Sequence, residues 1–234
     1  MNRSPLAVRM TWHDLLFAHW PLSPHVIRPL IPPVLQLDTF DGMAWLGVVP
    51  FRMSGVGPRV LPPLPGVSAF AELNVRTYVR HQERPGVWFF SLDAADPLAV
   101  RVARRFFHLP YFDAQMSCRS RAGWIEYRST RTHRGAPPAT LDVRYRPAGD
   151  VYRSRPGDLD HWLTERYCLY AVDRAAGLRR VDIEHEPWPL QPAEATWREN
   201  RMAEPLGLPL APTPTCLHFA RRLSVVAGPL LREA

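Results

Sequence analysis

The sequence contains no lysine, so all 29 of its basic residues are arginine. A gene rich in G and C would produce this bias, but the chemical consequence is the same whatever its origin. Without an internal ε-amine the chain cannot form a Schiff base with a carbonyl substrate. Arginine cannot substitute, because its pKa above about 12 keeps it from acting as a neutral nucleophile. Enzymes that depend on a lysine imine are therefore excluded.

Cysteine and long apolar runs are also scarce. The three cysteines, which form no Cys-x-x-Cys pair, are Cys118, Cys168 and Cys216. This spacing indicates free thiols in a reducing compartment. No apolar run approaches the roughly 18 residues that a membrane helix needs, and residues 1–20 include Asp14 where a signal peptide would have its apolar core. We expect a cytoplasmic protein with no membrane partner.

Familiar cofactor and metal motifs are absent as well. The chain has no G-x-G-x-x-G, no phosphate-binding loop and no G-x-S-x-G elbow. Its nine histidines form no H-x-H, H-x-x-x-H or H-E-x-x-H pair, and Glu184-His185-Glu186 would alternate across a strand. We expect neither a cofactor nor a metal ion.

The net charge of +7 raises the question of nucleic acid. The arginines are scattered, and the densest groups are Arg101, Arg104, Arg105 and Arg119, Arg121. Neither group lies in a basic motif interleaved with aromatic residues. A nucleic-acid partner is a third alternative that we do not expect, and steep salt dependence of binding would distinguish it.

With 26 prolines against 13 glycines, the chain favours short strands and stiff turns over long helices. Residues 70–79 and 87–92 read as a hairpin turned at Pro85-Gly86, and residues 124–131 and 140–146 read as a second hairpin. Further strands are predicted over 42–51, 168–172, 178–185 and 217–226, with a helical turn over 25–30 and a short helix over 158–165. The count is about nine strands and two or three helices. We therefore expect one antiparallel, β-rich α+β domain over residues 1–234.

The best helix covers residues 96–107. Asp96 can cap it and Pro97 suits its first position. Leu98, Val102 and Phe106 recur every four residues, which predicts the buried face, and the arginines at 101, 104 and 105 would form a solvated outer face.

The most specific pattern is the polar face of residues 70–79, where Glu72, Asn74 and Arg76 alternate with apolar residues. Arg128 or Arg131 would join them from another strand, depending on which side faces inward. Such a face is either solvated or lines the lumen of a closed barrel, where it would suit a small anionic or carbonyl ligand. Inside a lumen, Arg76 is expected within about 4 Å of a carboxylate or a bound anion. Full exposure of the row would exclude the pocket.

A second polar cluster, Glu165-Arg166-Tyr167, ends the helix predicted over 158–165. It could simply cap that helix through an ion pair, or it could contribute Tyr167 to a pocket.

Several ordered segments resemble the domain-of-unknown-function 2071 family. They are HWP at residues 19–21, LDTFDGMAWLGVVPF at 37–51, FAELNVRTYV at 70–79, GVWFFSLDA at 86–94, LTERYCLY at 163–170 and HEPWPL at 185–190. That family is uncharacterised and is similar in turn to the acetoacetate decarboxylase superfamily.

The resemblance implies a cone-like antiparallel barrel flanked by two or three helices, with a central pocket. It also implies that Tyr111-Phe112 stand where the decarboxylase has its lysine pair, and that Glu72 lies on a strand like the one that carries a pocket carboxylate. The chemistry cannot carry over without lysine, even if the pocket does.

Two main hypotheses remain open. In the first, the protein binds a small organic ligand, or acts on one with Glu72 as a base, in a pocket formed by the residues named here. In the second, it is an interaction scaffold whose barrel is filled by its own side chains. Self-association into a homo-oligomer stays open in both. The candidate pocket residues are Glu72, Asn74, Arg76, Tyr111, Arg131 and Tyr167.

Overall fold

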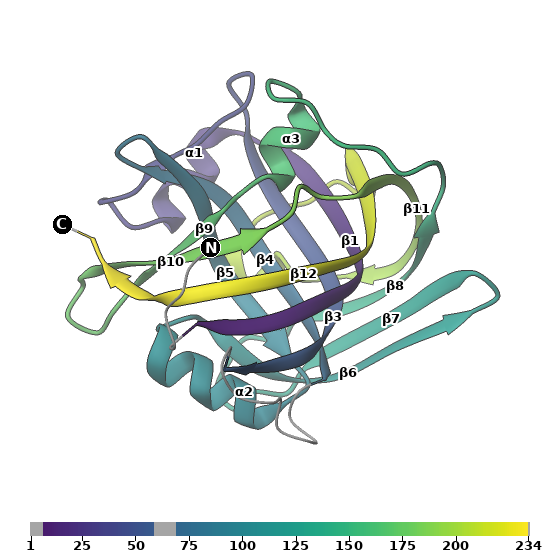
Figure 1. The fold of residues 1–234 in the computed structure, drawn as a ribbon, viewed down its shortest axis with the longest axis horizontal. Coiled ribbons are helices and arrows are strands. Elements are labelled where there is room, and N and C mark those ends of the chain that lie inside the picture. Colours follow the sequence, from purple (N-terminus) through teal and green to yellow (C-terminus); the bar gives the residue numbers. More distant parts are fainter. Residues whose placement is uncertain (1–6, 59–68, 234) are drawn as a thin grey trace.

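The computed structural model describes residues 7–58 and 69–233, and strands dominate it (Figure 1). The strands are β1 (Val8–Leu22), β2 (Gln36–Leu37), β3 (Ala44–Pro58), β4 (Phe70–His81), β5 (Arg84–Ala94), β6 (Tyr111–Arg121), β7 (Trp124–Arg131), β8 (Thr140–Pro147), β9 (Cys168–Val172), β10 (Leu178–His185), β11 (Leu190–Asn200) and β12 (Cys216–Arg232). The helical segments are α1 (Pro24–Ile27), η1 (Arg28–Leu30), α2 (Pro97–Val102), the π-helical turn η2 (Ala103–Phe107), α3 (Leu159–Thr164) and η3 (Glu204–Leu206). This confirms the predicted β-rich α+β class.

The strands close into a ring. β12, β1, β3, β4 and β5 pair antiparallel in that order. β9 lies beside β5, β10 beside β9, and β10 pairs with β12 to complete the circle. On the other side, β6, β7, β8 and β11 form a second path from β5 back to β12.

The shared strands therefore have two inner faces with different fillings. The face toward β7 and β8 packs into a solid core, in which Leu73 and Val75 of β4 meet Tyr127, Leu141 and Val143. The face toward β9 and β10 lines a cavity. The two sides of β4 thus separate a filled compartment from a hollow one.

The helix between β5 and β6 begins as predicted, since the Asp96 carboxylate accepts hydrogen bonds from the amides of Leu98 and Ala99. Its predicted buried face is wrong. Leu98 and Phe106 are exposed, whereas Val100 is fully buried and Ala99, Ala103 and Phe107 line the cavity. The change to a π-helical turn at residue 103 breaks the four-residue period before Phe106, and the segment covers a cavity rather than a solid core, so burial does not follow that period.

Both predicted hairpins are confirmed, but the turn of the first lies at Gln82 and Glu83, and Pro85-Gly86 belongs to β5. The predicted strands over 168–172, 178–185 and 217–226 are confirmed, as are the helical turns over 25–30 and 158–165. The sequence does not predict β1, β2, β6 or β11. Two pairs, β5–β6 and β5–β9, are parallel rather than antiparallel. No helix in the described ranges is long and apolar enough to cross a membrane.

Candidate functional site

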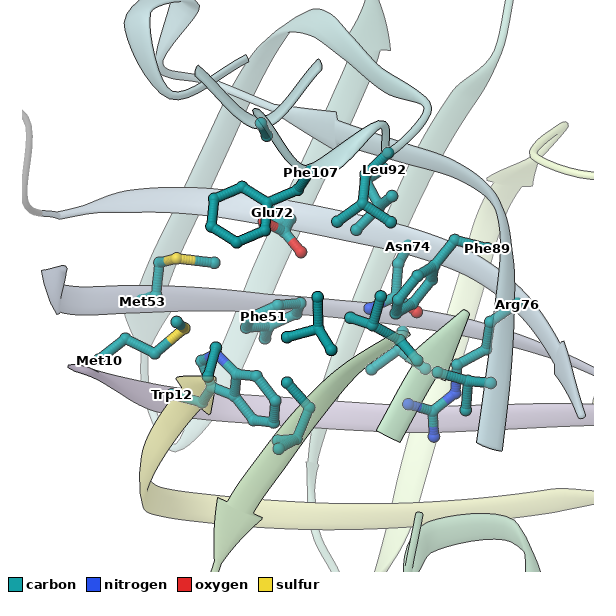
Figure 2. A pocket seen from close by; sticks show the side chains of 18 of the residues that line it. Met10, Trp12, Phe51, Met53, Glu72, Asn74, Arg76, Phe89, Leu92 and Phe107 are labelled. Carbon is teal, nitrogen blue, oxygen red and sulfur yellow. The ribbon is translucent and has the colours of Figure 1, made fainter. Parts of the chain in front are cut away.

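A cavity of about 250 Å³ occupies the hollow compartment, between the ring strands and the α2–η2 segment (Figure 2). Most of its wall is apolar. Large contributors on β1, β3, β5 and η2 are Met10, Trp12, Phe51, Met53, Phe89 and Phe107. Such a wall favours a ligand with a substantial hydrocarbon part.

The polar row predicted on β4 faces this cavity. Glu72, Asn74 and Arg76 all line it, because residues two apart on a strand project to the same side. Figure 2 shows Glu72 near Phe107, Arg76 further along the strand, and Asn74 between them. With about 3.3 Å of rise per residue, the row extends for roughly 13 Å along the wall. The row is not a solvated outer face.

Glu72 lies at the α2–η2 end of the row, and only 3% of it is exposed. The Tyr111 hydroxyl, from the first residue of β6, donates a 2.7 Å hydrogen bond to Glu72 Oε2. Burial raises the pKa of Glu72 to about 8, the Tyr111 hydrogen bond opposes the shift, and Asp93 adds to it. No cation forms an ion pair with Glu72 among the described residues. At neutral pH this carboxyl group is mainly protonated and can donate a hydrogen bond into the cavity.

Arg76, at the other end of the row, is half-buried and has no carboxylate partner in residues 7–58 and 69–233. Its Nη2 donates to the Leu163 carbonyl at 3.3 Å, and its guanidinium lies 5.4 Å from the Phe17 ring centre and 5.7 Å from that of Tyr78. No described carboxylate forms an ion pair with Arg76, so its positive charge has no partner among these residues, and the other half of the expectation, a bound anion, stays a prediction.

A buried histidine helps to define the surroundings of Arg76. The Tyr78 hydroxyl donates to the Leu163 carbonyl at 2.8 Å, so His19 Nε2, 2.7 Å from that hydroxyl, must carry the hydrogen and donate it. Burial first, and then Arg76, hold the pKa of His19 well below 6.5. His19 is therefore neutral and adds no second positive charge beside Arg76.

Two neighbouring polar groups also touch this end of the cavity. Arg166 lines it, but Arg166 Nη1 donates to Asp38 at 2.7 Å, so its charge is balanced. Asn74 is 5% exposed, and its Oδ1 has no hydrogen-bond partner. Arg76 is thus the unbalanced cation, and Asn74 an unused polar group, in an otherwise apolar space.

The structure places two of the six predicted pocket residues away from the cavity lining. Arg131 faces the filled side. Its Nη2 and Nε donate hydrogen bonds to Asp93 at 2.7 and 3.1 Å, and its guanidinium lies 4.2 Å from the Phe112 ring centre. Tyr167 is 43% exposed and stacks on His185. Both residues serve packing in this structure, while Glu72, Asn74, Arg76 and Tyr111 come together.

Much of the apolar wall was missed in the sequence. Met10, Trp12 and Phe17 come from β1, which was not predicted as a strand. The left-handed Asp14, with φ of 52°, bulges β1 and interrupts its alternation. The sequence signal for this strand is the mostly apolar run LLFAHW at residues 15–20, which is typical of a strand buried on both faces. Within the described ranges, no three histidine, cysteine, aspartate or glutamate side chains gather to hold a metal ion.

Solved structures with this architecture define the class of fold. The chain matches acetoacetate decarboxylase from Legionella pneumophila with a TM-score of 0.65 and 11% identity, over 97% of this chain and 87% of that one. It matches the enduracididine biosynthesis enzyme MppR complexed with pyruvate with a TM-score of 0.64 and 12% identity, over 98% and 91% of the two chains. The fold is therefore that of the acetoacetate decarboxylase-like proteins.

The family follows from sequence comparison. Residues 9–224 match the DUF2071 model, described as an uncharacterized conserved protein. The uncharacterized protein YqjF of Bacillus subtilis (strain 168) is 44% identical over 223 residues, which cover 95% of this chain and 91% of that protein. The chain belongs to the DUF2071 family, and the resemblance seen in its sequence is confirmed.

Proposed function

We propose that the cavity binds a small organic acid, with the ligand carboxylate on Arg76 and its apolar part along the wall of β1 and β3. The observation that carries this proposal is the uncompensated guanidinium of Arg76 in a largely apolar space. A cation without a partner is costly to bury, and a bound anion would remove that cost. The unpartnered Asn74 Oδ1 can accept a hydrogen bond from a hydroxyl group of the same ligand.

The far end of the row suits a carbonyl or hydroxyl group on the ligand. The neutral Glu72 carboxyl would donate to such an oxygen, while a second carboxylate there would be repelled as Glu72 ionised. MppR, which shares the fold alone with this chain, has been solved in complex with pyruvate, and this supports an oxo acid as the ligand.

A second candidate function is proton transfer on the bound acid by Glu72. Its pKa of about 8 lies close to neutral pH, where a general acid or base is most effective. Exchange of the α-protons of a bound oxo acid with deuterated water, followed by proton NMR, would detect this activity. Glu72→Gln should abolish the exchange while leaving the carboxylate on Arg76 bound.

The alternative of a purely structural scaffold agrees with the filled compartment but does not explain the cavity on the other side of β4. Thermal melts with a library of oxo, hydroxy and simple carboxylates separate the two. We expect some acids to raise the melting temperature of the wild-type protein, and Arg76→Met to remove that rise. Because Arg76 has no carboxylate partner, Arg76→Met should fold with little loss of stability.

Arg128→Met is the matched control. Arg128 lies on the exposed side of β7 and pairs there with Asp142, away from the cavity. This variant should keep the ligand response of the wild type. A library that stabilises the wild type and Arg76→Met equally would contradict the proposal, as would a complete lack of stabilisation by any acid.

A further inference from the structure

The α2–η2 segment exposes a row of apolar side chains to solvent. Leu98 is 54%, Val102 43% and Phe106 61% exposed, and the three are spaced four residues apart. The same segment also supplies part of the cavity wall through Ala99, Ala103 and Phe107, and Val102 contributes both to the exposed row and to the edge of that wall. The segment is therefore apolar on both sides, and only one of them is covered.

Arginines flank the exposed row. Arg101 is held by Asp113 at 2.8 Å, so its charge is balanced. Arg104 donates to the Tyr111 carbonyl at 2.7 Å, and the Arg105 guanidinium lies 5.7 Å from the Phe106 ring centre. Neither Arg104 nor Arg105 forms an ion pair with a carboxylate in the described part of the chain. The face thus combines exposed hydrocarbon with two unbalanced cations.

We propose that this α2–η2 face docks on the surface of a membrane that contains anionic phospholipids. Leu98, Val102 and Phe106 would enter the boundary between headgroups and acyl chains, and Arg104 and Arg105 would contact lipid phosphates. The sequence expectation of no membrane partner rested on the lack of a spanning run. Docking at a surface needs no such run, and it depends on a helix face that the sequence pattern had assigned to the core.

Charge complementarity favours an anionic lipid surface over other occupants. Two copies of this chain joined through the face would bring their Arg104 and Arg105 cations together, which is unfavourable. A nucleic acid would pair with the arginines but leave Leu98 and Phe106 without an apolar partner. An anionic bilayer offers acyl chains to the apolar side chains and phosphates to the two arginines.

The α2–η2 segment forms part of the cavity wall, so docking through it would also affect the cavity. Figure 1 shows α2 at the lower end of the ring, on the connection from β5 to β6. Since Phe107 and Ala103 face the cavity from this segment, docking would bring one wall of the cavity to the lipid surface.

The test is co-sedimentation of the whole protein with vesicles of phosphatidylcholine alone, or of phosphatidylcholine mixed with phosphatidylglycerol. We expect binding only to the mixed vesicles, weakening as salt rises. Leu98→Gln/Phe106→Gln should lower the affinity by at least about tenfold. Arg104→Gln/Arg105→Gln should lower it by about fivefold for each arginine and flatten the salt dependence.

Val151→Gln is the matched control, because Val151 is 62% exposed on the connection from β8 to α3. It should bind vesicles like the wild type. If the double apolar variant unfolds at a lower temperature, Phe106→Gln alone replaces it, since that side chain is the most exposed of the three. Each variant is also run on an analytical ultracentrifuge.

Three results would overturn the proposal. The first is no binding of the wild type to the mixed vesicles, and the second is equal binding by the apolar variant. The third is a wild-type dimer that Leu98→Gln/Phe106→Gln dissociates, which would assign the face to a second copy of the chain.

Discussion

The Tyr111 hydroxyl and the Glu72 carboxyl form a hydrogen-bonded pair of 2.7 Å in the cavity wall. Tyr111 is the first residue of β6, four residues after the helical segment ends at Phe107, while Glu72 is on β4. The hydrogen bond therefore ties the start of β6 to the row of polar side chains on β4. It also lowers the pKa of Glu72 against the larger effect of burial, because a donor to a carboxylate favours the charged form.

Tyr111→Phe should raise the pKa of Glu72 above its value of about 8, since the lost hydrogen bond is what opposes the effect of burial. Carbon-13 NMR titration of glutamate side chains would measure the shift. Tyr152→Phe is the control, because the Tyr152 hydroxyl donates to Asp160 rather than to Glu72. A Glu72 pKa that falls in Tyr111→Phe would show that the hydrogen bond does not act on the carboxylate.

Glu72 should make the protein less stable as pH rises through the neutral range. Its pKa is 4.5 when unfolded and about 8 when folded, so between these values the folded state holds a proton that the unfolded state has lost. Stability from this group is greatest below pH 4.5, decreases up to about pH 8 and is then constant, with a total change of at most about 5 kcal/mol.

Glu72→Gln should remove this slope, because a neutral amide of the same shape does not titrate. Urea unfolding at intervals from pH 5 to pH 9 gives the difference between variant and wild type. We expect Glu72→Gln to gain stability relative to the wild type from pH 5 up to about pH 8, and no more above that pH. A difference that stays flat from pH 5 to pH 9 would mean that Glu72 is ionised in the folded protein throughout.

The two arginines of β7 that the sequence left as alternatives should behave very differently. Arg131 and Asp93 are 3% and 0% exposed, so Arg131→Met leaves a buried carboxylate unpaired and should cost about 3–5 kcal/mol. Arg128→Met removes an exposed pair with Asp142 and should cost about 1 kcal/mol or less. Chemical denaturation measures both, and Asp93→Asn added to Arg131→Met should restore part of the loss. Equal costs would contradict the assignment of Arg131 to a core ion pair.

Borohydride reduction in the presence of acetoacetate should leave no adduct on any internal residue, because the chain has no lysine amine to form an imine. Intact-protein mass spectrometry with peptide mapping checks this, with borohydride alone as the control. An adduct mapped to an internal side chain would overturn the exclusion of imine chemistry.

The sequence predicted what depends on local periodicity. The alternation over residues 70–79 placed Glu72, Asn74 and Arg76 on one side, since a strand allows no other arrangement. It could not show that Arg131 belongs to Asp93, because these residues are 38 positions apart and meet only when β5 and β7 pack together. Closure of the ring, which decides what lines the cavity, has no local signal either.

The helix before β6 shows a different limit. Its cap followed from Asp96 and Pro97, but its face did not follow from the four-residue spacing of Leu98 and Phe106. That rule assumes a regular α-helix over a solid core. Here the helix widens at residue 103 and covers a cavity, and the residues that face inward are Ala99, Ala103 and Phe107.

Gly86 is predicted to be a turn residue, yet in the structure it is buried within β5, where β9 closes the ring. A Cβ at this position would lie 2.7 Å from Cys168 Sγ, 2.8 Å from a Tyr170 ring carbon and 3.0 Å from the Cys168 carbonyl oxygen. The last contact is with backbone, so the parallel β5–β9 pair would have to move apart. Gly86→Ala should therefore cost about 1–3 kcal/mol, as overpacking of a core does. Gly149→Ala is the control, because its Cβ would meet only the ring of the exposed Pro192, at 3.2 Å. Urea denaturation compares the two, and an unchanged stability of Gly86→Ala would mean that the ring does not close tightly between β5 and β9.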